Sequence, residues 1–331
     1  MRQLYIDRRD TRLDVDAGRL LIHVPDSPRA ASLPLMQLEC VTIGANTELS
    51  SRVLQALSKH GVRLVLLQGR AQQAITLTEP YRHGHAMRRI RQYALSLDET
   101  WLAEAARRLV GAKLHRQWRQ LRRWQVARPD QRLALHRATR QVRELLESSQ
   151  AAASRTTLLG IEGAAAAAYF AGFATVLAPS WGFVRRQRRP PPDPVNALLS
   201  LAYSMLHGDA VHALCGAGLD PSLGFLHRPA WSRESLACDL VELWRSPIDA
   251  WVWDLLRERQ LRPEHFSRPQ PGTCLLDKQG RQIFYPAWEI QARKWRKAMR
   301  RTASAWAEEL LALPLQLPEG LNDEQPANTA D

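Results

Sequence analysis

The chain has 331 residues, a formal net charge of +13 and a pI of about 10.3. This length allows two domains, and a composition of 45% hydrophobic and 24% charged residues is that of a globular rather than a disordered protein. No apolar run approaches the roughly 18 to 20 residues of a membrane helix, and the N-terminus has no secretory region. Four cysteines without a CxxC pair predict reduced thiols. We therefore expect a cytoplasmic protein with no membrane contact.

Short aliphatic and β-branched runs, separated by turn residues, predict strands throughout the first 80 residues. One helix is expected to interrupt them, with Ser50 or Ser51 as its N-cap and Gly61 at its end. The predicted strands are Leu4–Ile6, Leu13–Val15, Leu20–Val24, Cys40–Ile43, Arg63–Leu67 and Ala74–Leu77. We assign residues 1–82 to a small β-rich domain and residues 83–87 to a linker.

Helical periodicity replaces the strand pattern after the linker and predicts a larger all-α domain over residues 88–313. Two basic helical stretches and an Ala-rich helix come first, followed by helices over 194–207, 209–216, 232–260 and 287–312. Residues 264–286 break the helical pattern and predict a β-hairpin, with strands Cys274–Leu276 and Gln282–Tyr285 on either side of Asp277–Gly280. Residues 314–331 are rich in proline and acids and are predicted to be disordered. The expected fold class is α+β.

Positive charge is concentrated between Arg88 and Arg143, where fifteen Lys or Arg face only four acids. A solvated helix face usually mixes its signs, so this excess favours a polyanionic partner such as nucleic acid. The basic residues of the first long helix are expected to lie opposite its apolar face; they are Arg107, Arg108, Lys113, Arg116, Arg119, Arg122 and Arg123.

Glu162 is the one acid in the apolar and small-residue run that extends from Thr157 to Phe170. The alanines after it predict a helix. Because an ionised carboxylate among packed apolar groups is costly without compensation, Glu162 requires a cation or hydrogen-bond donors as partners. A purely structural carboxylate is the alternative.

Two further segments carry residues that suit a divalent cation. His227 lies in a loop rich in Gly and Pro, and Asp239 and Glu242, three residues apart on a predicted helix, face the same side with Arg245 close by. Imidazole and carboxylate groups suit Mn²⁺ or Mg²⁺ better than zinc, and Arg245 would offset charge on a reacting phosphate. This spacing is a weak motif, since a loop histidine often bonds to backbone and such acid pairs often lie at the surface.

Taken together, these segments resemble the CRISPR adaptation integrases, the CRISPR-associated protein one family, over about residues 1 to 310. Four blocks carry the resemblance in the family's order. They are Leu158–Gly163 with Tyr169-Phe170, Arg189–Ser200, Gly218–His227, and Ser235–Glu242 with Arg245.

The resemblance implies a role for each matching residue. Glu162, His227 and Glu242 match the ligands of the family's divalent metal, here Mn²⁺ or Mg²⁺, and Asp239 matches a second acid beside it. Arg245 matches a basic residue near the site. Polar positions lining the same cleft, which implies nucleic-acid contact, are matched by Asn196 and Tyr203.

The implied reaction is strand transfer, in which the 3′-hydroxyl of captured double-stranded DNA, the prespacer, attacks a phosphodiester at the border of a CRISPR repeat. The same site would cut DNA with water as the nucleophile. The β-rich domain is implied to form a homodimer, and such dimers to flank the family's small partner, CRISPR-associated protein two. The residues that we expect to contact DNA phosphates are Arg116, Arg119 and Arg123 on the first long helix and Arg185, Arg186, Arg188 and Arg189 before the Pro run.

Three alternatives stay open at this stage. A casposon-type integrase shares the fold and is expected to carry an additional DNA-binding domain at its C-terminus. A stand-alone nuclease for branched DNA would cut without joining, and a basic scaffold would use its acids only structurally.

Overall fold

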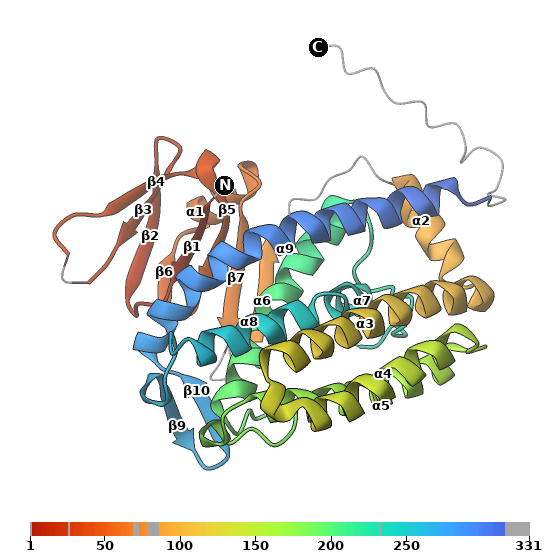
Figure 1. Cartoon of the computed structure of the whole chain (residues 1–331). Helices are drawn as coiled ribbons and strands as arrows, with labels where there is room; N and C mark the ends of the chain where they lie inside the picture. Colours follow the sequence, from red (N-terminus) through yellow and green to blue (C-terminus); the bar gives the residue numbers. More distant parts are fainter. Residues whose placement is uncertain (1, 26, 69–72, 79–85, 232, 315–331) are drawn as a thin grey trace.

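The computed structural model describes residues 2–25, 27–68, 73–78, 86–231 and 233–314. Its strands are β1 (Arg2–Ile6), β2 (Thr11–Asp16), β3 (Arg19–His23), β4 (Ala31–Pro34), β5 (Leu38–Ile43), β6 (Thr47–Leu49), β7 (Arg63–Gln68), β8 (Gln73–Thr78), β9 (Phe266–Gln270) and β10 (Thr273–Leu276). Its helices of two turns or more are α1 (Ser51–Lys59), α2 (Ala86–Leu95), α3 (Glu99–Ala127), α4 (Arg132–Gln150), α5 (Arg155–Val176), α6 (Pro194–Gly216), α7 (Ser235–Glu242), α8 (Arg245–Arg257) and α9 (Lys278–Ala312). The α+β class is confirmed, with strands first and helices after them (Figure 1).

Two four-stranded sheets form the N-terminal part. One has the strand order β1-β5-β7-β8, with β1, β5 and β7 parallel and β8 antiparallel to β7. The other has the order β4-β3-β2-β6. Alternating residues of β2 and β3 point inward, so Leu13 and Leu20 are fully buried with Val53 and Leu57 of α1. This period of two is what the sequence pattern predicts for half-buried strands.

The C-terminal part is a helical body in which α3, α4 and α5 lie side by side (Figure 1). Trp124 of α3 packs against Tyr169 and Phe173 of α5 in its core. Gly172 allows α5 to approach so closely, because a Cβ there would lie 2.7 Å from Leu121 Cδ2 and 3.0 Å from the Cβ of Ala138 on α4. Close packing of this kind fixes where Glu162, on the same helix, is held.

Helix α9 runs alongside both parts of the molecule (Figure 1) and takes part in a buried charge network between them. Asp209 of α6 accepts from Arg63 of β7 at 2.7 Å and from Arg296 of α9 at 2.8 Å. Arg296 also binds both carboxylate oxygens of Glu289, whose Oε1 accepts from the Tyr5 hydroxyl at 2.5 Å. Because Arg63, Asp209 and Arg296 are almost inaccessible to solvent, the network fixes the sheet against the helices.

Most expected elements are confirmed, with four corrections. The strands β4 and β6 were not anticipated. Residues 194–216 form one continuous helix, α6, whereas the helix predicted over 232–260 is two helices, α7 and α8, within the described residues. The hairpin lies earlier than predicted, between β9 and β10. Gln282–Tyr285 are helical because Asp277 accepts from the Gly280 amide at 2.7 Å and so caps the start of α9.

The predicted domain boundaries stay a prediction. Residues 83–85 of the expected linker and residues 315–331 of the expected tail lie outside the described residues, and Ala86 and Met87 belong to α2. Helix α5 is long and apolar enough to cross a membrane by length and composition alone, which the sequence reading overlooked. Here it packs against α3 and α4 and carries Glu162.

We expect Asp209→Asn to lower the free energy of unfolding by about 3 to 5 kcal/mol at pH 7, because it leaves two buried arginines short of a counter-charge. Burial raises the pKa of the Asp209 carboxyl, but Arg296 and Arg63 outweigh that and hold the pKa below its ordinary value. The contribution is therefore present above the unfolded pKa of about 3.9 and is lost as pH falls through the lower folded pKa. Urea titrations at pH 7 and pH 3 measure both effects.

The exposed Asp130, which pairs with Arg128 at the surface, provides the control. Asp130→Asn is expected to change stability much less than Asp209→Asn, because this ion pair is exposed at the surface. An Asp209→Asn protein as stable as this control would contradict a structural role for the network.

Candidate metal centre

The two predicted glutamates come together on one buried cation. Glu162 of α5 and Glu242 of α7 both accept a hydrogen bond from the ammonium of Lys113 on α3, with 2.5 Å between Lys113 Nζ and Glu242 Oε2. Lys113 is only 4% exposed and Glu242 5%, while the Glu162 side chain keeps 18% of its surface open. The compensating cation that Glu162 requires is thus supplied by the chain itself.

Glu242 is also paired with Arg245, whose Nε lies 2.8 Å from Glu242 Oε1. Burial raises the pKa of Glu242, but Arg245 and Lys113, with a smaller contribution from His227, outweigh it and bring the pKa to about 2. In return the Glu242 carboxylate helps to raise the pKa of Arg245 despite its burial. Glu242 is consequently an ionised acceptor under all ordinary conditions.

His227 is oriented by Asp239, which lies on α7. The Nδ1 atom of the ring is 2.6 Å from Asp239 Oδ1, and the other carboxylate oxygen accepts from the amides of Phe225 at 2.6 Å and Leu226 at 2.9 Å. Asp239 is fully buried, and burial raises its pKa while the bond to His227 acts the other way. With Nδ1 engaged in this network, Nε2 is the ring atom left to bind a ligand. Asp239 is therefore placed to position His227 rather than to hold a metal ion itself.

Gly224 makes this loop possible and was not singled out from the sequence. A Cβ at this position would lie 2.4 Å from the His227 carbonyl oxygen and 2.9 Å from Asp239 Oδ2. No side chain fits there without moving the atoms that orient the histidine. The Gly-rich composition of the loop was the only signal for it.

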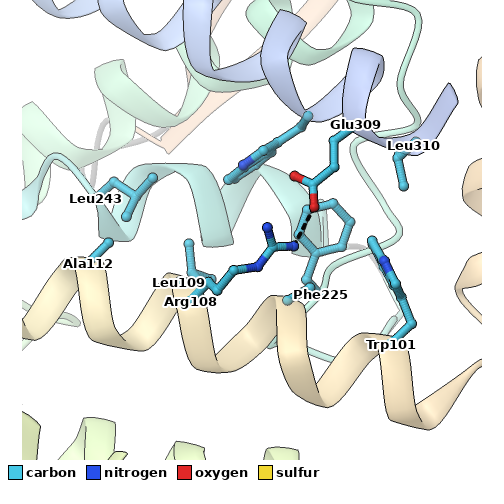
Figure 2. Close-up of a pocket in the computed structure, with 10 residues that line it drawn as sticks. Trp101, Arg108, Leu109, Ala112, Phe225, Leu243, Glu309 and Leu310 are labelled. Carbon is cyan, nitrogen blue, oxygen red and sulfur yellow. Dashed lines mark hydrogen bonds and ion pairs between the residues drawn. The ribbon is translucent and has the colours of Figure 1, made fainter. Parts of the chain in front are cut away.

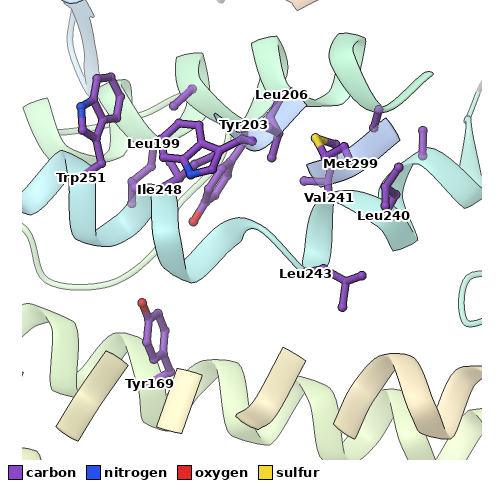
Figure 3. Close-up of a cluster of buried hydrophobic side chains, with 14 of the residues drawn as sticks. Tyr169, Leu199, Tyr203, Leu206, Leu240, Val241, Leu243, Ile248, Trp251 and Met299 are labelled. Atoms are coloured by element: carbon purple, nitrogen blue, oxygen red, sulfur yellow. The ribbon is translucent and has the colours of Figure 1, made fainter. Parts of the chain in front are cut away.

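Arg245 is held in turn by Tyr203 of α6. The guanidinium lies over the Tyr203 ring, 4.5 Å from its centroid, and Arg186 approaches the same ring at 5.4 Å. The Tyr203 hydroxyl donates to Asp249 of α8. Burial raises the pKa of Asp249 to about 6, against the hydrogen bond from Tyr203. Figure 3 shows Tyr203 inside the apolar cluster between α6 and α8, so its contacts favour a positioning role over direct contact with DNA.

Asn196, like Tyr203, is buried rather than exposed to DNA. It is fully buried near the start of α6, where its side chain accepts from Arg186 at 2.9 Å and from the Gln187 amide at 2.8 Å and donates to the Arg185 carbonyl at 2.9 Å. These bonds fix the segment before the Pro run. The arginines that this segment leaves exposed are Arg185, Arg188 and Arg189.

The basic residues of α3 fall into two groups, one exposed at the surface and one in contact with residues around the site. Arg119 and Arg123 are exposed, as expected. Arg116 instead donates to the Leu243 carbonyl and lies 4.6 Å from the centroid of the Trp244 ring. Lys113, which the sequence reading placed on the basic side, belongs to the buried face. Part of the positive charge of this segment therefore supports the site rather than the surface.

Small residues beside Glu162 leave one face of α5 open. Gly160, Gly163, Ala164 and Ala167 are exposed, and a Cβ added at either glycine would meet no atom within 4 Å. At about 100° per residue these positions lie roughly 100° to 200° around the helix from Glu162, so the open face is turned away from the carboxylate.

The donor set fits a divalent cation that prefers oxygen ligands. Two carboxylates from α5 and α7 converge on one positive charge, and His227, near enough to act on the pKa of Glu242, offers an imidazole nitrogen. Over the ranges that the structure describes, no three His, Cys, Asp or Glu side chains already converge closely enough to hold an ion. The two glutamates converge on Lys113 instead.

A separate pocket of about 120 Å³ lies behind the histidine loop, between α3 and α9 (Figure 2). Its wall is aromatic and aliphatic, with Trp101 and Trp306 each about 5.2 Å from the Phe225 ring, and an ion pair between Arg108 and Glu309 crosses it at 2.5 Å. It contains neither predicted metal ligands nor a carboxylate cluster. Phe225 connects this pocket to the histidine loop, because its ring lines the pocket and its backbone amide donates to Asp239.

The fold and this site define a class: a β-rich N-terminal part joined to a helical body that carries a carboxylate and imidazole centre. The model of the family described as CRISPR associated protein Cas1 matches residues 4–290. The chain belongs to the Cas1 family.

Individual relatives agree with this assignment. A protein named CRISPR-associated endonuclease Cas1 1, from Thermodesulfovibrio yellowstonii, is 34% identical over 313 residues, which are 94% of this chain and 98% of the relative. A solved structure titled as a casposase bound to integration product has a TM-score of 0.81 at 20% identity and covers 96% of this chain and 92% of its own. A chain of a Cas6-RT-Cas1–Cas2 complex has a TM-score of 0.80 at 21% identity over 94% of this chain and 35% of its own. At such identities these structures show a shared fold.

We expect Gly224→Ala to displace the His227 carbonyl and Asp239, and so to weaken divalent-cation binding by about 10- to 100-fold, the usual effect of disturbing groups that orient a metal ligand. Calorimetric titration with Mn²⁺ measures the change. Gly160→Ala, on the open face of α5, is the matched control and should leave binding unchanged. Equal affinities in the two variants would contradict the role given to Gly224.

Proposed function

We propose that this protein is the metal-dependent DNA integrase and endonuclease of CRISPR adaptation. It joins the 3′-hydroxyl ends of captured double-stranded DNA to the border of a CRISPR repeat by transesterification. The observation that carries the proposal is the convergence of Glu162 and Glu242 on Lys113 in a member of the Cas1 family, with His227 near enough to lower the pKa of Glu242. Relatives of this chain are named endonucleases, and the casposase of the same fold was solved with an integration product.

The carboxylates of Glu162 and Glu242 and the Nε2 atom of His227 would hold Mn²⁺ or Mg²⁺. Such an ion, when bound, supplies a positive charge that polarises a phosphodiester. The chain's own residues do the positioning. Asp239 fixes the ring of His227, and Arg245, stacked on Tyr203, fixes Glu242. Since strand transfer replaces one phosphodiester by another, orientation of the reacting groups dominates its rate.

DNA is proposed to approach over the exposed arginines of α3. Arg119 and Arg123 follow Lys113 on the same helix by 6 and 10 residues, which places them about 9 to 15 Å along its axis from the site. Arg185, Arg188 and Arg189 add positive charge from the segment that Asn196 anchors. Contacts of this kind bind phosphates without reading sequence.

A homodimer and the small partner Cas2 complete the proposal. The structural neighbour from a complex that contains Cas2 supports this assembly for the fold. We assign dimer formation to the β-rich part, as the resemblance implies. A casposon-type enzyme is the second candidate, because the casposase has the same fold, but the relative that matches 94% of this chain is named as a Cas1 endonuclease.

The reaction is tested with Mn²⁺, a short duplex with 3′-hydroxyl ends and a supercoiled plasmid bearing a repeat, with and without the partner. Glu162→Ala and His227→Ala are each expected to reduce joined products by about 100-fold or more, because each removes a metal ligand. Gel analysis of joined and nicked plasmid gives the readout. Glu104→Ala, an exposed acid of α3, should retain activity.

The products also discriminate between the candidates. Joining that is lost in both variants supports an integrase. Cutting without joining in the unmodified protein favours the stand-alone nuclease, and undiminished joining in both variants would remove the metal site from the mechanism.

The DNA surface is tested by the salt dependence of binding. We expect the double variant Arg119→Ala/Arg123→Ala to bind duplexes of any sequence more weakly and to reduce the slope of log K against log salt by about two, one for each lost phosphate contact. Fluorescence anisotropy at several salt concentrations measures the slope. The control is Arg140→Ala, since Arg140 already pairs with Glu144. A slope as steep as that of the unmodified protein would place the DNA elsewhere.

A further inference from the structure

Lys113 is not explained by the function proposed above, on which the following inference rests. Its ammonium already contacts both carboxylates that would hold the metal ion. We propose that Lys113 is an internal cation of the site, which an incoming divalent ion displaces from Glu162 and Glu242. Binding of the ion is then an exchange of one cation for another.

The geometry requires an exchange rather than a simple addition. Lys113 Nζ lies 2.5 Å from Glu242 Oε2 and is equally in contact with Glu162 Oε1. Mg²⁺ binds carboxylate oxygens at about 2.0 to 2.1 Å. An ion on the same two oxygens would stand in the space of the ammonium, and both charges are positive, so only one of them can remain between the carboxylates.

The surroundings allow the lysine to leave. Its four-carbon stem is flexible, and the side chain of its partner Glu162 is 18% exposed. Arg245 stays on the other oxygen of Glu242 and keeps that side chain in place during the exchange. His227 remains fixed through Asp239.

The exchange has a consequence for the choice of ion. Lys113 holds Glu162 and Glu242 close together, with its ammonium in contact with both carboxylates. A monovalent ion offers no advantage over an ammonium that is already in place, whereas a divalent ion brings twice the charge. Lys113 thus competes with every incoming cation and discriminates against monovalent ions.

The exchange can be measured through the reactivity of the lysine side chains. The chain has only five lysines, and the four besides Lys113 are exposed; they are Lys59, Lys278, Lys294 and Lys297. We would acylate the full-length protein briefly with an amine-reactive reagent and quantify each lysine by peptide mass spectrometry. The samples contain a chelator, saturating Mn²⁺, or NaCl at equal ionic strength.

Lys113 is expected to be protected with the chelator and with NaCl, and to react at least about tenfold faster with Mn²⁺. The four exposed lysines are internal controls whose rates should not change. If Mn²⁺ binds and Lys113 stays protected, the exchange is wrong, although the metal site stands.

Variants give an independent readout. Lys113→Met removes the competing charge while keeping most of the side-chain volume, so calorimetry should give an Mn²⁺ Kd at least about tenfold lower than that of the unmodified protein. Lys297→Met is the matched control and should leave the Kd unchanged. Weaker or equal binding in Lys113→Met contradicts the exchange, and if this variant does not fold, the labelling of the unmodified protein decides.

Failure of the underlying function is recognised separately. Mn²⁺ that binds neither the unmodified protein nor Lys113→Met would contradict the metal-dependent function itself. Mn²⁺ that binds equally well to Glu162→Ala would place the ion outside the proposed centre.

Discussion

The structure depends on the contact of one lysine with two glutamates. Lys113 lies 49 residues before Glu162 and 129 residues before Glu242, so the contact exists only when α3, α5 and α7 are all in place. Two nearly buried carboxylates without a cation would repel each other and would each lose their hydration. The close packing at Gly172, which brings α5 against α3, is therefore also a requirement of the site.

Each member of the centre is held in place by a neighbouring side chain. Asp239 is fully buried, and its two carboxylate oxygens bind the His227 ring and the backbone of the histidine loop. Tyr203 supports Arg245, and Arg245 supports Glu242. Groups that orient reacting residues in this way reduce the movement needed when substrate arrives. They also explain why several residues expected at the DNA surface are buried.

The sequence was sufficient for the fold class and for most elements, because strand and helix periods differ clearly between the two parts. It was not sufficient for the site. Spacing gave only weak hints at His227 and Glu242, and the resemblance to a family supplied their roles. The hairpin was misplaced because Gln282–Tyr285 are apolar and aromatic like a strand, whereas the cap at Asp277 decides for a helix. Tertiary context of this kind overrides local preference.

Lys113 shows what kind of signal the sequence did contain. The buried residues Leu109, Val110 and Gln117 of α3 lie four and three residues before Lys113 and four residues after it, so its position belongs to the apolar stripe and not to the basic face. Placing it on the basic side of the helix ignored that period. A lysine inside an apolar stripe needs an acid as its partner, just as Glu162 needs a cation. Lys113 and Glu162 meet this need for each other.

The same reasoning changes how the charge of the basic segment should be understood. Several of its cations are committed inside the protein, since Lys113 binds the glutamates and Arg88, Arg91 and Arg116 donate to backbone carbonyls of distant segments. The positive potential available to DNA is therefore smaller than the excess of basic residues suggests, and exposed arginines of α3 such as Arg119 and Arg123 contribute to it. Because these arginines and Lys113 share one helix, a phosphate ladder that binds along α3 as proposed would be held in a fixed register with the carboxylates. On this proposal a single helix connects the affinity for DNA with the position of the chemistry.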